Sequence, residues 1–151
     1  MKRTILFSLT LLIVALFMVG CCDCRKRSKL EKPLVGTTWQ LVQIMARDIT
    51  PEDHNYTLIL RSNGTATGKG DCNVFTATYR MTSSRELSIS NIGSTRRLCP
   101  NHEAENAFFD LLESVTHYEM DADIMLLLSN GTLVGMMKAM PADTNIDYLP
   151  L

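Results

Sequence analysis

The sequence has no excess of positive charge, because its 151 residues include 15 Lys and Arg against 16 Asp and Glu. Proteins that bind the nucleic-acid backbone usually carry a basic surface, so the composition argues against nucleic acid as a partner. The chain also lacks the low hydrophobicity of a disordered protein, since 46% of its residues are hydrophobic and 21% are charged. Its length suits one domain of ordinary size.

The one long apolar run, residues 5–19, is shorter than the roughly 20 residues that a bilayer-spanning helix needs. It follows Lys2 and Arg3 and ends before the small residue Gly20. This order is typical of a secretory signal peptide, which is removed from the mature protein. Residues 1–20 are therefore predicted to be a signal peptide and are left out of the fold.

The segment MVGC at residues 18–21 resembles the lipobox of bacterial lipoproteins, although Met18 stands where the pattern prefers Leu. The resemblance implies cleavage before Cys21, whose sulfur becomes diacylated. Several acyl chains make attachment to a membrane effectively permanent. We expect a lipid-anchored protein of the bacterial cell envelope, at the outer membrane and facing the periplasm or the cell surface. An uncleaved anchor is the alternative and would give a similar location.

Residues 21–32 are predicted to be the lipidated cysteine and a basic linker. Residues 22–32 carry five basic and two acidic side chains, a net charge of +3, and no aromatic residue. This segment cannot span more than about 40 Å when fully extended, and its charge favours anionic headgroups. Residues 33–151 carry eight basic and 14 acidic side chains, so the domain is acidic where the linker is basic.

Short strands with turns between them dominate the rest of the chain. Residues 75–81 alternate between apolar and polar side chains, the period of a strand with one face on a core. Two hairpins are predicted at the Asn-Gly pairs 63–64 and 130–131, because these residues tolerate the positive φ of a tight turn. The flanking strands are predicted at residues 58–61, 65–70, 124–128 and 132–137.

One amphipathic helix is predicted after Pro100. Its apolar face, at helical spacing, consists of Ala104, Ala107, Phe108, Leu111, Leu112 and Val115. Pro100 and Asn101 suit the start of this helix, and Glu103 and Glu105 favour the positive end of its dipole. A single helix among several strands predicts an α+β fold, in which the helix covers a curved antiparallel sheet.

Three segments together are similar to one family: GTTWQL at residues 36–41, GDCNVF at 70–75 and STRRLCP at 94–100. In order and spacing, with Glu103 and the helix behind them, they resemble the META domain of heat-inducible envelope lipoproteins of bacteria. This resemblance covers about residues 34–138.

The resemblance implies a small curved antiparallel β-sheet or incomplete barrel with one helix packed against it. We place this domain at residues 33–140, followed by a C-terminal tail at residues 141–151. The family supplies no recognised catalytic residue, and its members are associated with heat shock, stress, drug tolerance and virulence. Asp71, Arg97 and Leu98 depart from the family pattern. We expect a non-enzymatic envelope module without a cofactor, whose partner is an envelope protein, a lipid or a peptide.

Cys72 and Cys99 are the cysteines inside the predicted domain. An exported protein can form disulfides, and this bridge would close a loop of about 28 residues and stabilise the fold by roughly 3 to 4 kcal/mol. Two buried free thiols are the alternative, and a cysteine-dependent redox protein or enzyme is the least favoured hypothesis. Cys99, His102 and Glu105 stand at steps of three, as zinc would accept, but no fourth ligand is evident and no metal is predicted.

Two sets of residues are candidates for binding a ligand. Arg96 and Arg97 precede the helix, where a pair of guanidinium groups would suit an anion; a solvated or ion-paired role is the alternative. Trp39, Phe75 and Tyr79 would line a hydrophobic cavity if the incomplete barrel carries an acyl chain or a peptide. A lone Trp in a small domain, however, more often belongs to the core.

Overall fold

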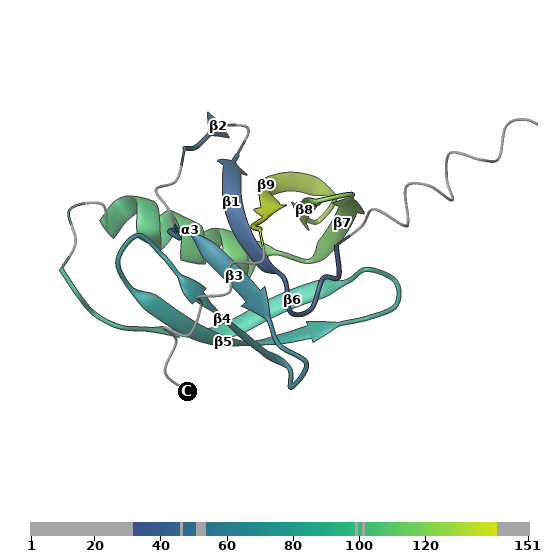
Figure 1. Cartoon of the computed structure of the whole chain (residues 1–151), viewed down its shortest axis with the longest axis horizontal. Helices are drawn as coiled ribbons and strands as arrows, with labels where there is room; N and C mark the ends of the chain where they lie inside the picture. The colour runs from purple at the N-terminus through teal and green to yellow at the C-terminus, as the bar shows by residue number, and fades with distance from the viewer. Residues whose placement is uncertain (1–31, 46, 51–53, 99, 101, 142–151) are drawn as a thin grey trace, which may run out of the picture. The chain divides into compact units, whose positions relative to one another are not determined.

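The computed structural model of the chain describes residues 32–45, 47–50, 54–98, 100 and 102–141 (Figure 1). The chain divides into two units between Glu31 and Lys32, and all the described residues belong to the second unit. The predicted signal peptide, Cys21, most of the linker and the tail after Pro141 lie outside the described residues. Within the described ranges, no helix has the length and apolar character needed to span a membrane.

The described residues form an antiparallel sheet of nine strands with one helix packed on it, which confirms the predicted fold class. The strands are β1 (Thr38–Ile44), β2 (Arg47–Asp48), β3 (Thr57–Leu60), β4 (Thr65–Lys69), β5 (Val74–Met81), β6 (Leu87–Ser94), β7 (His117–Asp121), β8 (Ile124–Ser129) and β9 (Thr132–Ala139). They follow the order β6-β5-β4-β3-β1-β9-β8-β7, with β2 paired to β1.

Both predicted hairpins are confirmed. β3 pairs with β4, and β8 pairs with β9. Gly64, Asn130 and Gly131 in the two turns have φ angles of 83°, 49° and 83°, the left-handed conformation that Gly and Asn tolerate best. The strand predicted at residues 75–81 is β5, whose first side chains alternate between exposed and buried.

The sheet curls so that its two end strands, β6 and β7, are joined near one end (Figure 1). There the backbone N–H of Leu87 donates to the carbonyl of Thr116 at 3.0 Å, and an isolated antiparallel bridge joins Glu86 to His117. The sheet remains open beyond this junction, as an incomplete barrel does.

Helix α3 (His102–Ser114) packs against the sheet through its apolar side chains. The ring of Phe108 is fully buried, with its centroid 6.1 Å from that of Phe75 in β5 and 5.6 Å from that of Tyr56, both edge to face. Leu111 lies against Gly135 of β9, where a Cβ would come 2.8 Å from Leu111 Cδ1. The helix thus contacts both halves of the curved sheet.

The buried face of α3 differs in part from the predicted one. Phe108, Leu111, Leu112 and Val115 are buried as predicted. The prediction was wrong for Ala104 and Ala107, which are exposed, whereas Glu105 is only 4% exposed. Glu105 points inward because its carboxylate accepts hydrogen bonds from buried donors. These hydrogen bonds stabilise the fold more than burial of the two alanine methyl groups would.

Candidate functional site

A buried hydrogen-bond network joins the loop before β5 to helix α3. Glu105 Oε1 accepts from the backbone N–H groups of Asn73 at 2.9 Å and Cys72 at 3.2 Å. Glu105 Oε2 accepts from the side-chain nitrogen of Asn73 at 2.6 Å. Any Cβ at Gly70 would overlap the Glu105 carboxylate, so this loop needs glycine where it meets the helix.

The same asparagine holds the segment that follows β6. Asn73 Oδ1 accepts from the hydroxyl of Thr95 at 2.8 Å and from the backbone N–H of Arg97 at 2.8 Å. Asn73 Nδ2 also donates to the carbonyl of Arg97 at 3.3 Å. One buried side chain therefore connects the segments GDCNVF and STRRLCP, which lie far apart in the sequence.

The network fixes the ionisation of Glu105. Burial alone would raise the pKa of Glu105, but hydrogen bonds from the Asn73 side chain and from the backbone N–H groups of Asn73, Cys72 and Asp71 together lower its pKa below the usual value. The carboxylate is thus ionised at neutral pH with its acceptor sites occupied. This arrangement suits a group that holds the fold rather than one that transfers protons.

Tyr56 lies beside the network and shares its acidic surroundings. Burial raises the pKa of Tyr56 from 10.0 to about 12, helped by the negative charge of Asp71 and by a hydrogen bond to that carboxylate. Tyr56 therefore stays protonated at neutral pH and packs edge to face on Phe108. Asp71, which departs from the family pattern, contributes to the raised pKa of this phenol.

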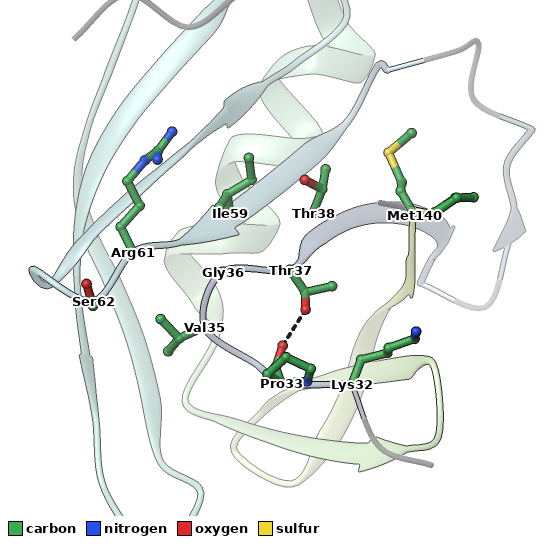
Figure 2. A pocket seen from close by; sticks show the side chains of 11 residues that line it. Lys32, Pro33, Val35, Gly36, Thr37, Thr38, Ile59, Arg61, Ser62 and Met140 are labelled. Atoms are coloured by element: carbon green, nitrogen blue, oxygen red, sulfur yellow. Dashed lines mark hydrogen bonds between the residues drawn. The ribbon is translucent and has the colours of Figure 1, made fainter. Parts of the chain in front are cut away.

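An open pocket of about 780 Å³ lies where the described chain begins, and we call it the Lys32 pocket (Figure 2). Its lining includes the cationic side chains of Lys32 and Arg61, which Figure 2 shows on opposite sides of the pocket. Hydroxyl groups come from Thr37, Thr38 and Ser62, and the apolar part includes Val35, Ile59 and Met140. This lining combines positive charge, hydroxyl groups and hydrocarbon.

Backbone hydrogen bonds fix the wall of the Lys32 pocket. The N–H of Gly36 donates to the carbonyl of Leu60 at 2.8 Å, and the Thr37 hydroxyl donates to the carbonyl of Pro33 (Figure 2). Gly36 has a φ of 86°, a conformation that a side chain at this turn would strain. The pocket is therefore built by a segment that is held in place without a ligand.

A second open pocket, of about 550 Å³, lies on β4 to β6 and also includes Arg61. Its other lining residues are mostly short hydroxyl side chains, among them Thr65, Thr67 and Thr76, with Val74 and Phe75 as apolar members. Arg61 Nε donates to Thr67 Oγ1 at 3.1 Å. Arg61 thus contributes to both pockets, which the sequence did not predict, because a single Arg before a turn forms no motif.

The model of the META domain family matches residues 32–141 of the chain. The chain belongs to the META domain family. No curated protein matches the chain at a significant level.

Solved structures resemble this META domain in fold. A DUF4847 family protein from Bacteroides vulgatus has a TM-score of 0.57 at 16% identity, with 73% of this chain and 96% of that chain covered. A protein solved by NMR has a TM-score of 0.56 at 18% identity, with 70% of this chain and 90% of that chain covered. A protein from Burkholderia xenovorans, also solved by NMR, has a TM-score of 0.54 at 24% identity, with 71% of this chain and 83% of that chain covered. At these identities the likeness concerns the fold alone.

The aromatic residues predicted to line a cavity of the META domain lie in different places. Trp39 is 0% exposed, and its indole N–H donates to the carbonyl of Leu34 at 3.1 Å, so it belongs to the core. Tyr79 is half-buried, and its hydroxyl donates to the carbonyl of Arg61 at 2.8 Å. Phe75 borders the pocket on β4 to β6, but it is 1% exposed and its ring packs on Phe108 and Phe109 in the core.

The described residues include the arginine pair and Cys72 of the META domain. Arg96 and Arg97 are exposed and line neither of the two pockets, so the anion site proposed there stays a prediction. Cys72 is half-buried and has an interaction partner in the structure. Cys99 and the lipidation residue Cys21 lie outside the described residues. Among the side chains that the structure describes, no three of His, Cys, Asp or Glu gather to hold a metal ion.

Proposed function

We propose that this META domain is a lipid-anchored, non-enzymatic binding module of the bacterial cell envelope that takes part in the stress response. The observation that carries this proposal is the Lys32 pocket. Lys32 is the last residue of the predicted linker and lines that pocket together with Arg61. A ligand bound there would be held close to the membrane that carries the acyl chains of Cys21.

The chemistry of the described side chains favours binding over catalysis. Asn73 and Glu105, the buried polar residues of the family-like segments, make hydrogen bonds to each other and to the backbone. Acid–base or nucleophilic catalysis needs a group with a free proton or lone pair next to a substrate site. The Lys32 pocket instead offers fixed positive charge and hydroxyl groups, which bind and orient a ligand.

A carrier of an acyl chain or a peptide is the second candidate function, and the exposed apolar side chain of Val74 in the pocket on β4 to β6 favours it. The burial of Trp39 and Phe75 in the core removes two of its expected lining residues. Native mass spectrometry of gently purified protein without acyl chains decides this point. A bound mass supports the carrier, whereas a clean apo mass counts against it.

The anchor is tested by labelling growing cells with palmitate. We expect label in the natural chain and in Cys22→Ala, and none in Cys21→Ala, because the two cysteines are adjacent and only Cys21 follows the lipobox. The labelled chain should fractionate with the envelope. An unlabelled chain found in the cytosol with residues 1–20 intact would contradict the proposal.

The binding role is tested by crosslinking the full-length protein in its native membrane and identifying what is attached. We expect crosslinks from positions around the Lys32 pocket, for example from Ser62. Crosslinks from Met45 serve as the control, since this exposed residue lines neither pocket. Equal products from both positions would argue against a specific site.

A further inference from the structure

Charge is unevenly distributed over the elements of this domain. Residues 57–98, which form β3 to β6 and their connections, carry six basic and two acidic side chains, a net charge of +4. The other described residues carry three basic and eight acidic side chains, a net charge of −5. Four of these eight acidic side chains belong to helix α3, so the region of β3 to β6 is positive and much of the negative charge lies on the helix.

The Lys32 pocket adjoins the positive region of residues 57–98, since Ile59, Arg61 and Ser62 belong to β3 and the turn after it. Among the described residues that line this pocket there are two cations and no carboxylate. A guanidinium, an ammonium and hydroxyl groups are the donors that bind phosphate oxygens. The apolar side chains beside them suit the glycerol and upper acyl region of a lipid, and the volume of about 780 Å³ accommodates such a headgroup.

Because the pocket includes Lys32, the length of the linker limits the distance between the pocket and the membrane. About 11 residues separate Cys21 from Lys32, so an acylated Cys21 keeps the pocket within roughly 40 Å of the bilayer. A tether of this length gives the headgroups a high effective concentration at the pocket. Even a weak phosphate site would therefore be occupied, and the basic linker adds attraction to the same anionic surface.

We propose that the Lys32 pocket binds the phosphate of an anionic phospholipid in the bilayer to which the chain is tethered. The inference rests on the proposed anchor through Cys21. Lys32 and Arg61 supply positive charge for the phosphate from opposite sides of the pocket, and the bond from Arg61 Nε to Thr67 fixes the guanidinium there.

The test uses the mature acylated chain in vesicles of phosphatidylcholine, with or without phosphatidylglycerol. A photoreactive benzophenone side chain replaces the exposed Ser62 at the pocket rim, and mass spectrometry detects one attached phospholipid. We expect attachment in vesicles that contain phosphatidylglycerol, and about a fivefold lower yield for Arg61→Gln, because one cation near an anionic surface contributes about that factor. Lys32→Gln should give a similar loss.

Arg47→Gln is the matched control, because Arg47 is exposed on β2, lines neither pocket and loses the same charge. An equal loss in Arg47→Gln and Arg61→Gln would mean that net charge alone acts, and would overturn the pocket. Equal attachment in vesicles without phosphatidylglycerol would overturn the anionic preference. Complete displacement by glycerol phosphate would show a site for free phosphate and overturn docking on the membrane.

Failure of the anchor is distinguished from failure of the pocket by a second tether. The chain without acyl groups carries an N-terminal histidine tag and is held on vesicles by a nickel-chelating lipid. Attachment that depends on Arg61 in this system supports the pocket even if palmitate labelling of Cys21 fails. Loss of the Arg61 dependence with the acylated chain intact would overturn the pocket and leave the anchor in place.

Discussion

Glu105 is a charged side chain that this fold uses as a hydrogen-bond acceptor. Glu105 is 4% exposed, and its carboxylate accepts hydrogen bonds from the backbone of Cys72 and from the backbone and side chain of Asn73. Protonation would place a donor where two backbone N–H groups and an amide already donate. The stabilising effect of Glu105 therefore exists only while the carboxylate is ionised.

We expect the free energy of unfolding to fall as the pH drops below 4.5, the ordinary pKa of a glutamate. The pKa of Glu105 is lower in the folded state than in the unfolded chain. Its contribution is therefore fully present above the unfolded pKa and is lost as the pH falls through the folded pKa. Glu105→Gln removes this titration and should flatten the pH dependence measured by urea unfolding.

Glu103→Gln is the matched control for this experiment. Glu103 is exposed on the same helix, so the variant changes the charge equally without removing the buried hydrogen bonds. If Glu105→Gln keeps the acid dependence of the natural chain, another group is responsible for it.

Residue type and spacing predicted some roles and missed others. A lone Trp in a small domain is usually core, and Trp39 is. Glu105 was assigned to the helix dipole because helical periodicity describes only local neighbours. Its actual partners stand 32 and 33 residues earlier in the chain, and no local pattern reports such a contact. Arg61 was missed for the same reason, since both pockets arise from segments brought together by folding.

At the scale of the elements, β4 lies unusually close to its neighbours at Gly68. A Cβ at this position would overlap the backbone carbonyl oxygen of Thr57 in β3 and lie 2.7 Å from Phe75 Cε1. Gly93 in β6 has no atom within 4 Å of the corresponding point. A methyl group added at Gly68 would therefore clash with its neighbours, whereas one added at Gly93 would not.

We expect Gly68→Ala to lower the free energy of unfolding by about 3 kcal/mol, because the backbone of β3 must move to admit the methyl group. Gly93→Ala should change it by less than about 0.5 kcal/mol. Urea unfolding of the two variants measures the difference. Similar values for both would contradict the close contact between β3 and β4 at this point.

The sequence predicted the elements whose local signal is strong. Asn-Gly pairs located both hairpins, and alternation located β5. β7 was not predicted, because it is an end strand in which no side chain is fully buried, so its apolar pattern is weak. The helix was found from its spacing, but its inward face depended on Glu105 and on partners outside the helix.

At the scale of the whole molecule, the predicted disulfide would add to global stability. Asn73 holds Arg97 through two hydrogen bonds, which brings the neighbour of Cys72 to a residue two positions before Cys99. We expect reduction of the natural chain to lower the free energy of unfolding by about 3 to 4 kcal/mol. Urea unfolding with and without reductant measures this loss.

Two cysteine variants provide the comparison for the disulfide. Cys99→Ser should be less stable by a similar amount and should no longer respond to reductant. Cys22→Ser, in the linker, should respond like the natural chain. Rapid alkylation of Cys72 in the unreduced folded protein would instead show a free thiol and contradict the bridge.

The junction between β6 and β7 bears on how the protein avoids self-association. The end strands of an open sheet offer unpaired backbone groups to any other strand, including one from a second copy. Here the hydrogen bond from Leu87 to Thr116 joins the two end strands at one point, and helix α3 packs beside β6. If the helix detached, the edge of β6 would be exposed and able to pair with a strand from another copy of the chain. The helix therefore protects the protein against aggregation and is also part of the core.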